Sequence, residues 1–294
     1  MTAPRPAGEA VAALSRLPGI REGVEEAREA CTALRWHPAL RRRIPESAAE
    51  SRVRGAHATA ELEGVTRPLA HVRELVLGLR PWPAELDPVE RVLHGAIAAT
   101  TESEHVGHFV IHAPLQALAR LHAVAASGLV RPDALGRPRT HDEVCRELTD
   151  LGPAPPAAVA RERLASAVGE LAAMGTEVPA VVVAAVVHAE IASARPFLAG
   201  NALVARAFDR AVVRASGLDP TGVAVTEWGH ASGGATAYLG ALVAYHRGDL
   251  DGVSLWIRQC CTAMVQAAEA GTRVADDVLA GRFSGGLAVP PQEE

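Results

Sequence analysis

The chain has 294 residues, of which 49% are hydrophobic and 21% are charged, with a formal net charge of −5 at pH 7. These proportions are ordinary for a globular protein, and the acidic balance excludes the basic face that nucleic-acid binding requires. No nucleic acid is therefore expected as a partner. The 29 basic residues are all arginine, which excludes a lysine-dependent phosphate loop or a Schiff base.

The cysteines and the apolar runs predict a cytoplasmic protein without a membrane segment. The four cysteines show neither a paired disulfide spacing nor a C-x-x-C motif, as is typical of reduced, buried thiols. No signal peptide is recognisable at the start. The longest apolar run, residues 178–187, is about half as long as a bilayer span and predicts a buried helix.

The first part of the chain predicts an N-terminal helical arm over residues 1–80. Apolar residues recur at helical spacing in three segments, residues 9–34, 44–64 and 68–79. The proline-rich stretch 80–88 predicts a connector, which would separate this arm from the rest of the chain.

The remainder predicts a helical core over residues 81–281. Glycine and proline are dense in residues 127–144, which predicts a loop or a small β-hairpin. The tail, residues 282–294, contains glycine and proline and predicts disorder. The expected fold class is thus all-α with at most one hairpin. The helices of the core are expected at about 88–100, 106–127, 151–171, 179–192, 201–216, 234–247 and 251–280.

Residues 195–206, RPFLAGNALVAR, lead into the most regular of these helices. Asn201 is a favourable N-cap for a helix over residues 201–216, and Gly217 would end it. Gly200 and Asn201 would then lie at a helix N-terminus, where unpaired N–H groups and the helix dipole favour an anion. The stretch therefore predicts a site for phosphate or another anion.

The same stretch resembles the signature of the Fic/Doc (Fido) family, which runs H-P-F-x-(D/E)-G-N-G-(R/K)-x-x-R. Family members are mostly α-helical, and those with the full pattern generally transfer AMP from ATP to a target hydroxyl. The resemblance implies a Fic-like helical fold with ATP or another nucleotide as ligand. The positions that this chain shares with the signature are Pro196, Phe197, Gly200, Asn201 and Arg206.

Four positions depart from the family pattern. Arg195 stands in place of the general-base His, and Ala199 stands in place of the acidic residue that holds Mg²⁺. Ala202 replaces the second Gly, and Leu203 replaces the basic residue that contacts phosphate. An arginine stays protonated at neutral pH, and an alanine offers no oxygen ligand. We therefore expect no catalytic residue in this loop, no bound metal and no standard AMP transfer.

A second segment matches the family. Residues 59–64, TAELEG, fit its inhibitory pattern (S/T)-x-x-x-E-(G/N), with Thr59, Glu63 and Gly64 in register. In relatives this Glu pairs with the last Arg of the signature and blocks productive ATP binding. The resemblance therefore implies a pairing of Glu63 with Arg206, either as a regulatory latch or as a structural ion pair.

Loss of the base and of the metal ligand still leaves anion binding open. Arg195, Gly200, Asn201 and Arg206 are the candidate nucleotide- or phosphate-binding residues, because two guanidinium groups could neutralise an anion held at the helix N-terminus. In the structural alternative, Arg195 forms a salt bridge with Glu190 on the preceding helix.

These observations predict a regulatory or scaffolding pseudoenzyme that binds a nucleotide or anion weakly. We expect it to act through a protein partner and to form a homodimer through helical faces. The alternative is an active transferase whose base comes from elsewhere in the chain and which modifies a protein hydroxyl. Residues 129–139 would position that target, since they lie where the family has its target-positioning flap.

Four histidines are weaker candidates for chemistry. His105, His108 and His112 recur at spacings of three and four, which indicates either a metal site on one helix face or a solvated helix start. His188 lies in an apolar helix and is expected to be a buried, hydrogen-bonded core residue.

Overall fold

The computed structural model describes residues 8–174 and 178–282. Within these ranges it contains α-helices and short 3₁₀ helices but no β-sheet, so the all-α fold class is confirmed. Of the loop or small hairpin expected in residues 127–144, the structure has the loop: an isolated bridge joins Ser127 and Val130, and turns and the 3₁₀ helix Pro132–Ala134 follow. The predicted disorder concerns a tail whose residues 283–294 lie outside the described ranges.

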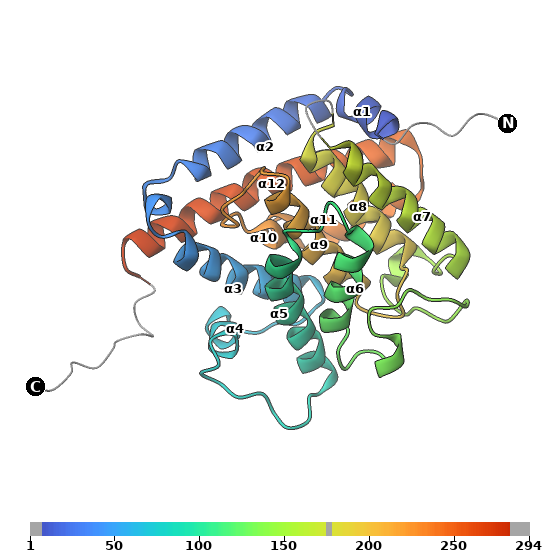
Figure 1. The fold of residues 1–294 in the computed structure, drawn as a ribbon, viewed down its shortest axis with the longest axis horizontal. Helices are drawn as coiled ribbons and strands as arrows, with labels where there is room; N and C mark the ends of the chain where they lie inside the picture. The colour runs from blue at the N-terminus through green and yellow to red at the C-terminus, as the bar shows by residue number, and fades with distance from the viewer. Residues whose placement is uncertain (1–7, 175–177, 283–294) are drawn as a thin grey trace, which may run out of the picture.

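The helices follow one another through the whole described chain, and their order can be traced by colour in Figure 1. Short 3₁₀ helices lie at Pro38–Arg41, Pro132–Ala134, Thr149–Leu151 and Glu170–Ala173. The α-helices are α1 (Glu9–Ser15), α2 (Ile20–Arg35), α3 (Ile44–Leu62), α4 (Leu69–Val76), α5 (Pro88–Val106), α6 (Pro114–Ala125), α7 (Ala157–Gly169), α8 (Ala180–Ala194), α9 (Asn201–Ala215), α10 (Thr226–Ala231), α11 (Gly234–His246) and α12 (Leu250–Leu279).

Several boundaries differ from those expected. The segment predicted over 9–34 is divided into α1 and α2, and the helix predicted over 88–100 continues to Val106. The helix predicted from residue 106 starts only at Pro114, because residues 107–113 form turns and a proline is favourable in the first turn of a helix. The helix predicted over 151–171 starts at Ala157, after three prolines that cannot donate backbone hydrogen bonds. The short helix α10 was not predicted, because its six residues are too few to show helical periodicity.

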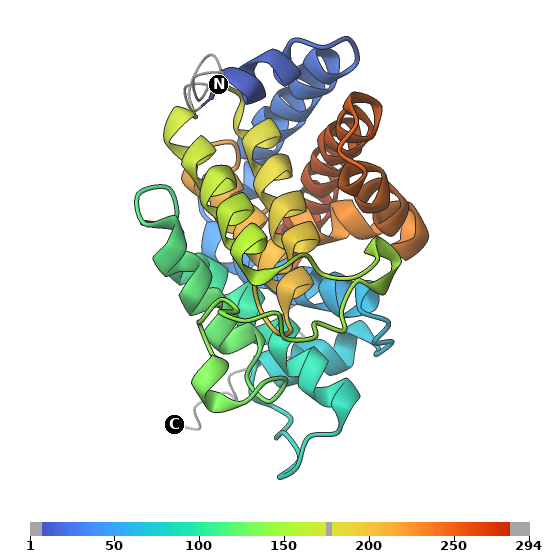
Figure 2. The same ribbon diagram turned by 90° about the vertical axis from the view of Figure 1, so that its right-hand side faces the viewer.

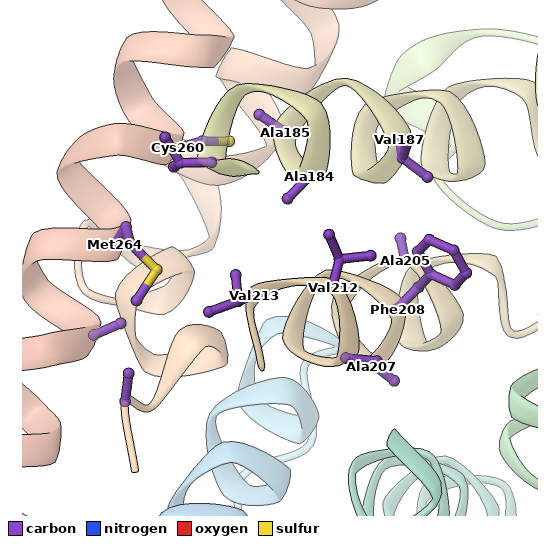
Figure 3. Packing of buried hydrophobic residues seen from close by; sticks show 14 of the residues in the cluster. Ala184, Ala185, Val187, Ala205, Ala207, Phe208, Val212, Val213, Cys260 and Met264 are labelled. Carbon is purple, nitrogen blue, oxygen red and sulfur yellow. The ribbon is translucent and has the colours of Figure 1, made fainter. Parts of the chain in front are cut away.

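Helices α8 and α9 form the centre of the molecule, and almost every side chain of both is buried. The residues between them are mainly alanine and valine, with Phe208 of α9 as a larger group (Figure 3). Such small side chains allow helices to approach closely. The six-residue loop 195–200 joins the pair, so the signature residues are anchored at both ends by the best-buried helices.

The remaining helices surround this pair. Helix α2 lies along α12 (Figure 1), and α7 lies beside α8 (Figures 1 and 2). Helix α10 packs so closely against α12 that a Cβ added at Gly229 would lie 2.0 Å from the carbonyl oxygen of Ala263. Helices α2 and α3 contribute to the same hydrophobic core as α5, α9 and α12, so the expected N-terminal arm packs directly onto the rest of the fold.

Candidate functional site

The signature loop has a fixed backbone, built by residues that the sequence shares with the family pattern. Gly200 has φ +81°, and a Cβ there would lie 3.3 Å from the Cβ of Ala126. The Asn201 side chain closes the loop: its Oδ1 accepts from the Phe197 N–H (2.9 Å) and its Nδ2 donates to the Phe197 carbonyl (3.0 Å). Asn201 is thus the first residue of α9 and Gly200 is its N-cap, one position earlier than expected.

His122, on α6, holds this loop from the other side. Its ring stacks on Phe197 with 4.0 Å between centroids. Its Nε2 lies 3.1 Å from the Ala199 carbonyl, and its Nδ1 accepts from the Gly136 N–H at 2.9 Å. Burial lowers the pKa of His122 to about 4, despite the opposing hydrogen bond to Ala199. The imidazole is therefore neutral, with the proton on Nε2. No motif or spacing in the sequence had pointed to His122.

The low pKa of His122 predicts a loss of stability in mild acid. Between pH 6.5 and 4 the unfolded chain binds a proton at this ring that the native chain does not, so the free energy of unfolding falls as the pH falls. The full loss is about 3 kcal/mol. Urea unfolding at pH 7 and pH 4.5 should show a smaller difference between the two pH values for His122→Gln than for the unmodified chain. The exposed His141, changed to Gln, is the control and should leave the pH difference unchanged.

Arg195 does not face the cleft beside the loop. It adopts φ +45°, and its side chain is 1% exposed. Its guanidinium donates to four backbone carbonyls, those of Glu147 (3.2 Å), Leu148 (3.3 Å), Gly152 (2.9 Å) and Pro153 (2.9 Å). Arg195 therefore ties the signature loop to the irregular segment 147–153.

The salt bridge considered between Arg195 and Glu190 does not form. Glu190 instead accepts from Arg163 (2.8 Å) and from the Tyr245 hydroxyl (2.8 Å). The contacts of the Arg195 guanidinium are instead with backbone carbonyls of another segment. A role of Arg195 in phosphate binding stays a prediction, and it would require the guanidinium to leave these four oxygens.

The anion position at the start of α9 is filled by a side chain of the protein itself. Glu147 accepts from the backbone N–H of Gly200 through Oε1, and from the backbone N–H and the Nδ2 of Asn201 through Oε2, both at 2.9 Å. Burial and the negative charge of Glu63 raise the pKa of Glu147, while these three donors act to lower it. The carboxylate therefore occupies the N–H groups that a phosphate would need.

A cleft of about 630 Å³ opens beside this position. Its lining includes three carboxylates and the residues that replace the family's metal and phosphate contacts: Glu63, Glu143, Glu147, Ala199 and Leu203. Arg131 and Arg146 also line the cleft, and Arg131 pairs with Glu143 at 3.1 Å. Three carboxylates against two guanidinium groups leave the lining with a small excess of negative charge.

The contact expected between the inhibitory-like helix and the signature is formed. Arg206, 1% exposed, donates to Glu63 at 2.5 Å and to the hydroxyl of Thr59 at 3.1 Å. It also lies 3.5 Å from the Tyr238 hydroxyl. Gly64 follows the helix end with φ +78°, where it makes the turn out of α3. The contacts tie α3, α9 and α11 together, and a regulatory role for them stays a prediction.

Removing the charge of Glu63 should destabilise the fold. Glu63→Gln leaves the buried guanidinium of Arg206 without its counter-charge, and loss of one partner of a buried pair is costly. Because Glu63 is 24% exposed, we expect a loss of about 2 kcal/mol rather than the full value for a buried pair. Differential scanning calorimetry should show a lower melting temperature for Glu63→Gln but not for the more exposed Glu61→Gln. Equal melting temperatures would contradict a structural tie.

The four candidate histidines lie in different surroundings. His188 is buried and its Nε2 lies 2.8 Å from the Tyr238 hydroxyl, so the hydrogen-bonded core histidine is confirmed. His105 lies 3.3 Å from Glu102, and His108 packs edge-on against Phe109. In the described ranges His105, His108 and His112 do not form a group of metal ligands.

Among known proteins, no family model and no curated protein matches this sequence. Solved structures do match. A Fic family protein from Desulfovibrio desulfuricans has a TM-score of 0.62 at 19% identity, over 90% of this chain and 76% of that one. Fic-1 from C. elegans has a TM-score of 0.59 at 18% identity, over 90% and 73%.

A third solved structure is matched over nearly its whole length. A Fic domain containing signaling protein from Bacteroides thetaiotaomicron has a TM-score of 0.57 at 13% identity, over 86% of this chain and 98% of that one. At these identities the similarity concerns the fold. Together with the loop 195–200 between α8 and α9, it shows that this chain has the Fic fold.

Proposed function

We propose that the chain is a Fic-fold pseudoenzyme that does not transfer AMP by the family's usual chemistry and acts as a regulatory protein. The observation that supports this most strongly is the state of Arg195. The residue in the place of the family's base is a guanidinium held by four carbonyls, and it can neither accept a proton nor reach the cleft. A cytoplasmic location and a protein partner, expected from the sequence, are part of this proposal.

The signature loop lacks the family's metal ligand as well as its base. Phosphate transfer needs a cation that bridges the phosphates, and Ala199 supplies no oxygen in the loop where the family has a carboxylate. Residues 129–139 contain turns and the 3₁₀ helix Pro132–Ala134 but no β-strand. The absence of both a base and a metal ligand from the loop supports the proposal.

This site could still bind an anion or a nucleotide, which would compete with the Glu147 carboxylate for the N–H groups of Gly200 and Asn201. The N–H groups of Gly200 and Asn201 point at a carboxylate, which is itself an anion, so their geometry suits a phosphate oxygen. An incoming phosphate must displace Glu147 and tolerate the charge of Glu63. We therefore propose weak binding that strengthens when Glu147 is removed.

Glu147→Ala tests this part of the proposal. The variant should bind inorganic phosphate and ATP about tenfold more tightly than the unmodified chain, or better, because the N–H groups of Gly200 and Asn201 become available. The shift in melting temperature with each ligand, with and without Mg²⁺, measures the binding. Glu143→Ala removes a charge from the same cleft without touching α9 and serves as the matched control. Binding that is equally weak in all three proteins would refute an anion site here.

A second candidate function rests on one observation. Glu147 lines the cleft, its pKa is raised by burial, and its carboxylate contacts Asn201 of the signature. It could therefore serve as the general base of an active transferase, in place of the histidine that the signature lacks. Incubation with labelled ATP distinguishes the two. Transfer to the chain itself or to lysate proteins, lost in Asn201→Ala and in Glu147→Ala, would overturn the pseudoenzyme. No transfer by the folded, unmodified chain would support it.

A further inference from the structure

Two histidines and an aspartate meet in the core, at the place where α8, α9 and α10 come together. His188, Asp209 and His230 are 0%, 7% and 4% exposed. One ligand atom from each lies within 4.8 Å of those from the other two. His230 Nε2 is 3.2 Å from Asp209 Oδ2, which is close to the separation of about 3.3 Å between two ligands of a tetrahedral zinc ion.

Both histidines keep a ring nitrogen without a partner. The Nδ1 atoms of His188 and His230 are buried and make no hydrogen bond in the described structure, whereas buried polar atoms are nearly always paired. The Nε2 of His188 lies 2.8 Å from the Tyr238 hydroxyl. A metal-binding histidine usually donates its second ring N–H to an oxygen in this way, which fixes the orientation of the ring.

His188 thus has one ring nitrogen that is oriented by the Tyr238 hydroxyl and one buried nitrogen without a partner. This is the arrangement of a histidine that binds a metal through its second nitrogen.

A small cavity adjoins the group. Cys260 and Met264 of α12 line, with Asp209 and His230, a cavity of about 10 Å³. Figure 3 shows Cys260 beside Ala185 of α8 and Met264 facing Val213 of α9. Cys260 is not among the ligand atoms that lie within 4.8 Å of one another, so three protein ligands meet here. A cavity of this size is at the lower limit for a water molecule, which would be the further ligand of a bound ion.

We propose that His188, Asp209 and His230 bind a divalent transition metal ion of the zinc class. Two imidazoles and a carboxylate are donors that such an ion prefers, and a water molecule would complete a tetrahedral set. The ion would join α8, α9 and α10, the helices behind the signature loop. The site is separate from the cleft and does not depend on the proposed function.

Metal content of the full chain tests the site. The protein is prepared without a histidine tag, stripped with a chelator, given one equivalent of Zn²⁺ or Co²⁺ and desalted. We expect about one ion per chain by mass spectrometry and a melting temperature that rises by roughly 5 °C or more. Co²⁺ should give the strong visible absorption of a tetrahedral site. An unmodified chain that retains far less than one ion, or lacks this absorption, overturns the proposal.

Variants decide which residues hold the ion. Asp209→Asn, which keeps the side-chain shape, and His230→Gln should lose the ion. Two controls should keep it: Cys261→Ser, and a double change of the exposed His105 and His108 to Gln. Retention by every variant would place the ion elsewhere and refute the site. If the core variants do not fold, the metal content and the Co²⁺ spectrum of the unmodified chain decide alone.

Discussion

Restoring the lost signature residues and emptying the anion position should create AMP transfer. The variant combines Arg195→His, Ala199→Asp, Ala202→Gly and Leu203→Arg with Glu147→Ala. The four signature changes return the family's base, metal ligand and phosphate contact. The fifth frees the N–H groups of Gly200 and Asn201, which Glu147 otherwise occupies. Since each 1.4 kcal/mol in the barrier is about tenfold in rate, we expect a gain of several powers of ten in self-modification.

The same experiment contains its controls. A variant with the four signature changes but with Glu147 retained should transfer AMP much more slowly, because the carboxylate competes with the phosphates of ATP. Adding Asn201→Ala to the full set should remove the activity, since Asn201 fixes the loop through both of its contacts with Phe197. Activity is measured with labelled ATP, and folding by circular dichroism. A folded, ATP-binding fivefold variant without transfer would show that the loop is no longer a catalytic frame.

Loss of the Arg195 guanidinium should be among the most destabilising single changes in the chain. Arg195→Met keeps the apolar stem but removes hydrogen bonds to four carbonyls, three of them within 148–153. Hydrogen bonds to a charged group contribute about 1.5 to 3 kcal/mol each, and water can replace only some of them. We expect a loss of about 3 kcal/mol, which in a chain of this size lowers the melting temperature by about 6 °C or more.

The control for this change is Arg146→Met, at an exposed position next to the same segment. It removes the same charge and should leave the melting temperature nearly unchanged. Hydrogen exchange should locate the effect of Arg195→Met in residues 147–153 and in the loop 195–200. Equal stability of both variants would show that the carbonyl contacts contribute nothing and would leave Arg195 free for another role.

Part of the site could be read from the sequence because it depends on local pattern. The spacing of Pro196, Phe197, Gly200, Asn201 and Arg206 identified the loop, and TAELEG identified the partner of Arg206. Residue chemistry alone excluded a base at position 195 and a metal ligand at position 199. Helical periodicity likewise predicted most helices, since it reflects contacts within a few residues along the chain.

Long-range contacts through irregular backbone could not be read in this way. Glu147 reaches the start of α9 across 53 positions, from a segment without periodicity, and nothing in the spacing of residues 137–156 specifies that path. The carbonyl partners of Arg195 lie in the same segment. The core group of His188, Asp209 and His230 comes from three different helices, including α10, which is too short to predict.

The sequence by itself determined that the chain is helical, that it carries a Fic-like signature, and that the signature lacks its base and its metal ligand. Only the tertiary structure decided what fills the resulting site: a carboxylate on the helix N-terminus and a guanidinium turned toward backbone carbonyls. The physical reason is that helix formation and proton affinity are properties of residues and their near neighbours. The occupant of an anion position is set by whichever charged side chain the fold brings there.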